Sequence, residues 1–356
     1  MGDPRIRQMA QVLIAHSIRV QNDEQVLIQS TPLAMPLVEE LYRLILERGG
    51  HPVPFFTTER LQRIFYETAP DEKLDTLPGI IREAYLQADA LISIDAPENR
   101  RELMQVDPKR LQRHRKAKAP LLDRYMRNEA KWVVSLFPTP SLAQDADMPL
   151  SQYEDFVFDA INQDWNRMKA TMEKAKALFD EAREVRIESP GTNLVIGLEG
   201  RHGVIDGGEN NMPGGEFFYA PVEHQTEGTV TFEWPQVYNG REVSGIRLVF
   251  RDGKVTEATA EKGADFLHEV LETDEGARYL GELGIGCNTG ITRYTKNTLF
   301  DEKMGGTVHL AIGQAYEECG GKNRSAVHWD MVKDLRKGGR IYLDGRLVQE
   351  NGEWCF

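Results

Sequence analysis

Carboxylates and imidazoles gather in the stretch from Gly281 to Asp330. Glu282, His309 and His328 lie within it, and Asp330 closes it. These side chains are the ligand types that zinc, iron, manganese and cobalt use in proteins. One residue separates His328 from Asp330, and residues i and i+2 of an extended strand point to the same face. The stretch therefore predicts a metal site in which one strand supplies two ligands.

Three further features belong to the same hypothesis. Glu216 follows a glycine-rich turn and precedes the apolar run FFYAP, where a carboxylate is costly without a nearby cation. Tyr316 follows His309 by seven residues, which would place both on one face of a helix. A polar cluster that contains Arg293 and Lys296 is suited to binding a substrate carboxylate or to stabilising developing charge. Spacing alone leaves open whether these residues form a metal site or are ordinary structural and surface residues.

Composition limits the class of protein. The chain has 356 residues, more than one core usually holds, so two domains are expected. Its net charge of -13 argues against a nucleic-acid partner. Cys287, Cys319 and Cys355 fit neither a zinc knuckle nor a disulfide framework, which predicts a reducing, cytoplasmic location. The sequence contains neither a signal-peptide pattern nor an apolar run of about 18 residues, so no membrane partner is expected.

The first part of the chain alternates between two periodicities. Short apolar runs at Val26–Ile28, 51–56, 90–94 and 131–137 are predicted strands, and helical spacing lies between the first three. Such alternation predicts a parallel sheet with right-handed crossovers. The motifs GxGxxG and GxxxxGK[ST] are absent, so the fold alone does not indicate a nucleotide site. We therefore predict a doubly wound α/β domain with a mostly parallel sheet.

The sequence pattern differs in the rest of the chain. A charged helical stretch is expected over about 97–128, and a helical segment with an apolar stripe over 150–180 joins the two domains. Short strands with Gly, Asn and Asp turns follow. The predicted domains are a Rossmann-like α/β domain at 1–183, whose helical linker is at about 141–183, and a β-rich α+β metal-binding domain at 184–356.

Several blocks of the sequence resemble those of one family. They are NMPGGEFFYAPVE, TDEGARYLGELGIGCN, NTLFDEKMGGTVHLAIG and NRSAVHWD. Together they resemble the thermophilic-type metalloaminopeptidases, which include aminopeptidase T, aminopeptidase S and related leucyl aminopeptidases. The resemblance covers essentially the whole chain and is densest from about 132 to 354. It implies an α/β N-terminal domain, a C-terminal metal domain and a homodimer that encloses the active sites.

The resemblance also implies a ligand set and a reaction. Two divalent ions (zinc, cobalt, manganese or magnesium) would activate a shared water against peptide substrates. We expect Glu282 to bridge the ions, with Asp330 as a second possibility. Tyr316 is expected to act as a ligand or catalytic group. The general base is left open, with Glu216 as the first choice if it is not fully committed to metal. Carried over motif by motif, the expected ligands are Glu216, Glu282, His309, Tyr316, His328 and Asp330.

Two other functions are compatible with parts of this pattern. His309, His328 and Asp330 form a two-histidine, one-carboxylate set, which is the grip of a mononuclear non-haem iron oxygenase. The dihydroxypyridine dioxygenases resemble such a use of the same scaffold. The presence of both Glu216 and Glu282 favours two metals and hydrolysis. A metal-free binding module would require the match of all six ligand types to be a coincidence.

Overall fold

The computed structural model describes residues 2–356, and its internal contacts divide the chain into two compact units. Unit 1 runs to Asn162 and includes Gly208–Pro213, and unit 2 comprises Gln163–Gly207 and Gly214–Phe356. The domain boundary expected between residues 183 and 184 stays a prediction, and the contacts divide the chain at other points. In the described residues, no helix has both the length and the apolar character that crossing a bilayer requires.

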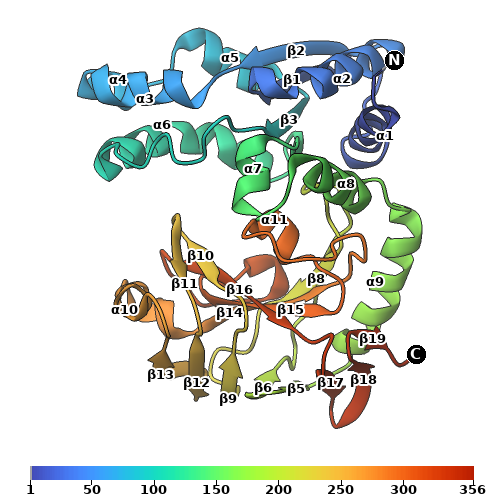
Figure 1. Ribbon diagram of the computed structural model, residues 1–356, viewed down its shortest axis with the longest axis vertical. Coiled ribbons are helices and arrows are strands. Elements are labelled where there is room, and N and C mark those ends of the chain that lie inside the picture. The colour runs from blue at the N-terminus through green and yellow to red at the C-terminus, as the bar shows by residue number, and fades with distance from the viewer. Residues whose placement is uncertain (1) are drawn as a thin grey trace. The chain divides into compact units, whose positions relative to one another are not determined.

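Unit 1 is built on a parallel sheet of four strands in the order β2-β1-β3-β4 (Figure 1). Consecutive residues Val26, Leu27 and Ile28 are all buried in β1, as expected for a parallel strand that is covered on both faces. On one face, Leu27 packs with Tyr125 and Ala88. The predicted doubly wound α/β fold is confirmed.

Helices alternate with the strands of unit 1. The side chain of Asp107 accepts a hydrogen bond from the backbone of Lys109, and Pro108 begins α6. The charged helix expected over 97–128 therefore begins later, because the residues before this cap form turns. In chain order the elements are α1 (Pro4–Val12), β1 (Gln25–Ser30), α2 (Met35–Glu47), β2 (His51–Phe56), α3 (Glu59–Thr68), α4 (Asp71–Leu74), α5 (Gly79–Gln87), β3 (Ala90–Asp95), α6 (Pro108–Met126), β4 (Lys131–Leu136), α7 (Pro140–Asp145) and α8 (Leu150–Ile161).

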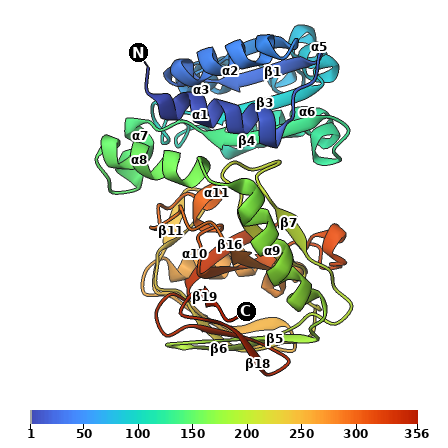
Figure 2. The ribbon, with the colours of Figure 1, turned by 90° about the vertical axis from the view of Figure 1, so that its right-hand side faces the viewer.

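Unit 2 contains two antiparallel sheets that lie as layers (Figure 2). The larger sheet runs β13 (Lys254–Thr259), β12 (Arg247–Arg251), β9 (Thr226–Thr231), β6 (Thr192–Gly197), β5 (Glu184–Ser189), β17 (Arg340–Leu343), β18 (Arg346–Glu350) and β19 (Glu353–Trp354). The smaller sheet runs β16 (His328–Asp334), β15 (Thr307–Gly313), β14 (Leu280–Gly286), β8 (Glu216–Tyr219) and β7 (Val204–Asp206). The hairpin β10 (Gln236–Tyr238) and β11 (Arg241–Val243) and the helices α9 (Trp165–Asp180), α10 (Ala264–Leu271) and α11 (Thr298–Asp301) complete the unit. The predicted β-rich second part is confirmed.

The long helical segment expected over 150–180 is interrupted. The side chain of Asp164 accepts a hydrogen bond from the backbone of Arg167 and so caps a new helix, α9. Phe179 near the end of α9 packs edge-on against Phe217 of β8, with ring centroids 5.2 Å apart. This contact fixes α9 against the smaller sheet, which is the sheet that carries the candidate site.

Candidate metal centre

One face of the smaller sheet carries most of the expected ligands. Strand pairing aligns Glu216 of β8 with Gly286 of β14 and aligns Glu282 of β14 with Ala311 of β15. Ala311 in turn pairs with Asp330 of β16. Because side chains alternate along each strand, these polar groups share one face. The pairing of β8 with β14 brings the stretch 281–330 onto the turn before Glu216.

The opposite face of the same strands is apolar. Phe217, Leu283, Ile285, Leu310 and Met331 are all buried there and form part of the core of unit 2. The sheet therefore separates a hydrophobic side, which holds the strands in register, from a charged side, which is available for chemistry.

Glu282 lies at the centre of the charged side. Its Oε1 is 3.1 Å from Nε2 of His309, and its Oε2 is 3.2 Å from Nε2 of His328. The same His328 nitrogen is 3.5 Å from Oδ1 of Asp330, and Nδ1 of His309 is 3.6 Å from Oε2 of Glu216. Possible ligand atoms of Glu282, His309 and Asp330 all lie within 4.8 Å of one another. The structure thus brings together five of the six expected ligands through a continuous series of contacts.

Backbone carbonyls orient both histidines. Nδ1 of His309 is 3.0 Å from the carbonyl oxygen of Glu302, and Nδ1 of His328 is 2.9 Å from that of Gln314. A carbonyl can only accept, so each Nδ1 must carry the proton that it donates. Each Nε2 is left directed at Glu282. Metal-binding histidines are commonly held in this way, with one ring nitrogen bonded to an outer partner and the other presented to the ion.

The charged side fits a cation. Among the described residues, Oε2 of Glu216 and Oδ1 of Asp330 are buried and have no hydrogen-bond donor. Buried carboxylate oxygens without donors are costly unless a cation lies nearby. Carboxylates with imidazoles are a suitable donor set for zinc, cobalt, manganese or iron.

The ionisable groups influence one another strongly when no metal is bound. Burial lowers the pKa of both histidines, but the surrounding carboxylates outweigh it and raise these pKa values to about 10 for His309 and about 12 for His328. Burial raises the pKa of Asp330, yet contact with His328 outweighs this and lowers it to about 2. Burial raises the pKa of Glu216 to about 8 despite the nearby Lys303. The metal-free cluster therefore holds protons that a bound cation would displace.

Gly284 leaves the space that His309 occupies. The two residues pair across β14 and β15, and a Cβ on Gly284 would lie 1.9 Å from Cε1 of the imidazole. Any side chain here would push the ring from its position. The sequence interpretation did not identify this glycine, because its role depends on the register of two strands that are far apart in the chain.

A buried lysine beside the cluster was also missed. Lys303 is 0% exposed, and its Nζ lies 3.2 Å from Oε1 of Glu216 and 3.7 Å from Oδ2 of Asp206. It also pairs closely with Glu302. The only signal in the sequence was the run Asp301-Glu302-Lys303 within an otherwise apolar block, and such a run is usually exposed to solvent.

Tyr316 reaches the site by a different route from the one expected. The helical spacing assumed between His309 and Tyr316 is wrong, because β15 is extended and ends at Gly313, where φ is +99°. The chain then turns, and the ring of Tyr316 meets that of His328 edge-on, with centroids 5.3 Å apart. Tyr316 thus borders the cluster at its more open side, where 39% of the residue is exposed.

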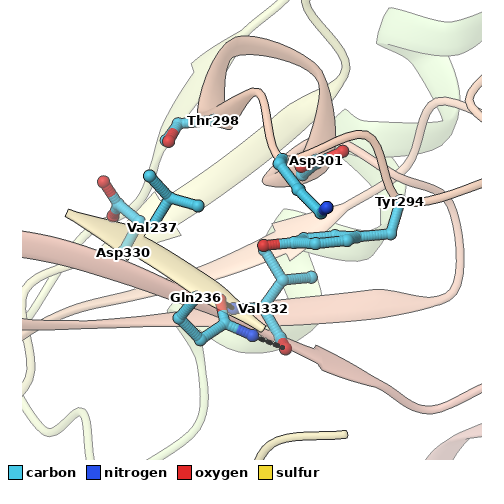
Figure 3. A pocket seen from close by; sticks show the side chains of 8 residues that line it. Gln236, Val237, Tyr294, Thr298, Asp301, Asp330 and Val332 are labelled. Atoms are coloured by element: carbon cyan, nitrogen blue, oxygen red, sulfur yellow. Dashed lines mark hydrogen bonds between the residues drawn. The ribbon is translucent and has the colours of Figure 1, made fainter. Parts of the chain in front are cut away.

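The two expected substrate-binding residues differ in their positions. Lys296 shares a small cavity with Asp330, whereas Arg293 is exposed and is not part of the cavity lining. Figure 3 shows Asp330, Val237 and Thr298 on one side of this cavity and Tyr294 on the other. The complete lining is Gln236, Val237, Tyr294, Lys296, Thr298, Asp301, Asp330 and Val332.

Comparison with known proteins places the chain in a family. The chain is 28% identical to aminopeptidase 2 of Geobacillus stearothermophilus, over 99% of this chain and 98% of that protein. It is 26% identical to aminopeptidase T of Thermus thermophilus, over 98% of each. The solved structure of wild-type AmpT from Thermus thermophilus matches with a TM-score of 0.85 at 25% identity, over 99% of both chains.

A second solved structure shares the fold at lower similarity. It is the 2,5-dihydroxypyridine dioxygenase from Pseudomonas putida KT2440, with a TM-score of 0.59 at 16% identity, over 99% of this chain and 98% of that one. The family model described as thermophilic metalloprotease (M29) matches residues 2–354. The chain therefore belongs to the thermophilic metalloprotease family M29.

Proposed function

We propose that this chain is a metal-dependent aminopeptidase that removes N-terminal residues from peptides at a two-metal site. The relatives from Geobacillus stearothermophilus and Thermus thermophilus are aminopeptidases, and the family is one of metalloproteases. Zinc, cobalt, manganese and magnesium are the candidate ions. The proposed ligands are Glu216, Glu282, His309, His328 and Asp330, and Tyr316 is proposed as a ligand or catalytic group.

The position of Glu282 is the observation that carries the proposal. Its two carboxylate oxygens face two different histidines, each through Nε2 and each at little more than 3 Å (3.1 and 3.2 Å). A two-metal site needs a group that touches both ions, which lie about 3.5–4 Å apart. A carboxylate between two imidazoles is arranged for that role, which favours Glu282 over Asp330 as the bridge.

Charge balance gives independent support for two ions. Five carboxylates, each at most 15% exposed, belong to the cluster: Asp206, Glu216, Glu282, Glu302 and Asp330. Lys303 offsets one of these charges, and two divalent ions would offset the other four. A single divalent iron, as in a mononuclear oxygenase, would leave two of these carboxylates to be neutralised by protons, as burial favours for Glu216 in the metal-free cluster.

The proposed reaction assigns a role to each group. When bound, the two ions supply Lewis acidity that polarises the scissile carbonyl and lowers the pKa of the attacking water. Glu216 would take the proton from that water, since its Oε2 has no hydrogen-bond donor among the described residues. Tyr316 borders the cluster beside His328, and, where it does not bind an ion, its hydroxyl would donate to the carbonyl oxygen.

Metal content and activity measured together test this function. We expect about two divalent ions per chain by elemental analysis. We also expect release of the chromogenic product from aminoacyl anilides, lost on chelation and restored by the ion. One iron per chain with oxygen consumption, and no hydrolysis, would instead indicate the dioxygenase alternative. Light scattering of the same sample tests the expected homodimer.

A further inference from the structure

Unit 1 contains an apolar cavity of about 240 Å³ that the proposed reaction does not use. Gln29 and Phe55, near the carboxyl ends of β1 and β2, line it together with residues of α3, α5 and α6 and of the segments before α3 and α5. Aliphatic, aromatic and proline residues make up ten of its fifteen lining residues. The cavity thus lies at the carboxyl ends of β1 and β2, the side of an open parallel sheet on which ligands bind.

One half-buried basic residue lines this cavity and has no counter-ion among residues 2–356. Lys118 of α6 lines the cavity, and within the described residues its ammonium group has neither an ion-pair partner nor a hydrogen-bond acceptor. The pKa of Lys118 is lowered by burial alone, so no nearby acid compensates its charge. By contrast, Arg113 of the same helix is paired with Asp71 and Asp75.

The lining also indicates which charge a bound ligand would carry. None of the fifteen lining residues is acidic, and the buried His114 lies one helical turn before Lys118. His114 is oriented by its Nδ1, which lies 3.3 Å from the carbonyl oxygen of Leu74. An anion would compensate the charge of Lys118, whereas a cation would be repelled by it.

We propose that this cavity binds a small apolar carboxylate, with Lys118 pairing to the carboxylate and the apolar lining enclosing the hydrocarbon part. An apolar cavity of about 150 Å³ holds one benzene molecule. The larger volume here has room for an aromatic ring with a short acid-bearing chain. The cavity lies in unit 1, whereas the metal cluster belongs to unit 2.

Three probes of similar shape test the proposal by calorimetry on the full-length chain. They are 3-phenylpropionate, 3-phenylpropan-1-ol and 3-phenylpropan-1-amine, used after chelation so that no probe coordinates a metal. We expect the acid to bind about tenfold more tightly than the alcohol, because an ionised partner strengthens a hydrogen bond by that order. The amine should bind most weakly. Equal affinities for acid and alcohol, or no binding at millimolar concentration, would overturn the proposal.

Variants locate the binding. Lys118→Met should remove the preference for the acid but keep binding of the alcohol, and Lys118→Arg should retain the preference. Lys116→Met is the matched control, since Lys116 is exposed on the same helix and is not part of the lining. Ile81→Trp should fill the cavity and weaken all three probes. If Lys118→Met leaves the preference unchanged while Ile81→Trp leaves all affinities unchanged, the probes bind elsewhere and the assignment is wrong.

Discussion

The parallel sheet of unit 1 and the smaller sheet of unit 2 bury different kinds of side chain. In unit 1, the interior positions of β1 and β3 are apolar, as at Val26 and Ile92. In unit 2, every residue of β14 and β15 is buried, yet these strands carry Glu282 and His309. Apolar burial alone can stabilise the first sheet. The second also needs cations to compensate its buried charges, so its structure and its chemistry depend on the same groups.

Replacing Glu282, the central carboxylate of the charged side, should reduce ion binding and activity by the largest amount. Glu282→Ala leaves His309 and His328 without their shared partner, and we expect loss of at least one bound ion and of activity. The loss should exceed the 10–100-fold that changes in outer partners typically cause. Elemental analysis and anilide hydrolysis measure both effects. Ser93→Ala, in the middle of β3, is the matched change in the apolar sheet and should change neither the metal content nor the hydrolysis. Full activity in Glu282→Ala would mean that Glu282 does not belong to the site.

A single methyl group should disturb the charged face nearly as much. Gly284→Ala places a Cβ 1.9 Å from the current position of the His309 ring, so the imidazole must move away from Glu282. We expect at least about a tenfold weaker affinity for the ion, which corresponds to about 1.4 kcal/mol. Titration with a competing chelator measures it. Gly79→Ala is the control in unit 1, because a Cβ at that glycine meets nothing within 4 Å. Unchanged affinity in Gly284→Ala would mean that His309 does not bind the ion through its present position.

The sequence predicted the doubly wound sheet well and the charged face only in part. Alternation of apolar runs with helical spacing identified β1, β2, β3 and β4. The types of the expected ligands were visible in the motifs, but the sequence did not indicate that the face of β14 and β15 that carries them is itself buried. The helical spacing assumed for Tyr316 was wrong because the chain from His309 to Gly313 is an extended strand and then turns.

Buried charges were the least predictable feature of the sequence. Lys303 sits in a local run of charged residues that resembles an exposed turn. Only the pairing of β7 with β8 and of β8 with β14 brings Asp206 and Glu216 to it. Contacts of this kind depend on residues that are distant in the chain, and local patterns carry no information about them.

Lys303→Met tests whether bound cations compensate the charges of the buried carboxylates. Removing one partner from a buried group of charges costs about 3–5 kcal/mol, so the metal-free protein should unfold more easily. The cluster becomes more negative, and a bound cation should then stabilise it more than in the wild type. We expect the difference in Tm between metal-loaded and metal-free protein to widen. Lys333→Met is the control, since Lys333 is equally buried but pairs with the more exposed Glu233. A narrower difference in Lys303→Met would contradict the argument.

Acid should weaken ion binding through the histidines. In the metal-free protein the pKa of His309 is raised to about 10, so this ring is protonated at neutral pH and must lose a proton to bind an ion. His328, with a pKa raised to about 12, must do the same. Affinity should rise by about tenfold per pH unit for each proton released between pH 6 and 8. Calorimetry in buffers of different ionisation enthalpy counts these protons; affinity independent of pH would exclude histidine ligands.

The smallest expected effects concern the two basic residues near the site. Lys296 lines the cavity that reaches Asp330, and its Nζ lies 3.7 Å from Glu242, whereas Arg293 is exposed and outside the lining. Lys296→Met should therefore raise KM for short peptides by a few-fold, an effect of about 1 kcal/mol or less, with little change in kcat. Arg293→Met should leave both constants unchanged. If the two variants behave alike, the cavity beside Asp330 does not bind the peptide, and the charged face selects its substrate by its metals alone.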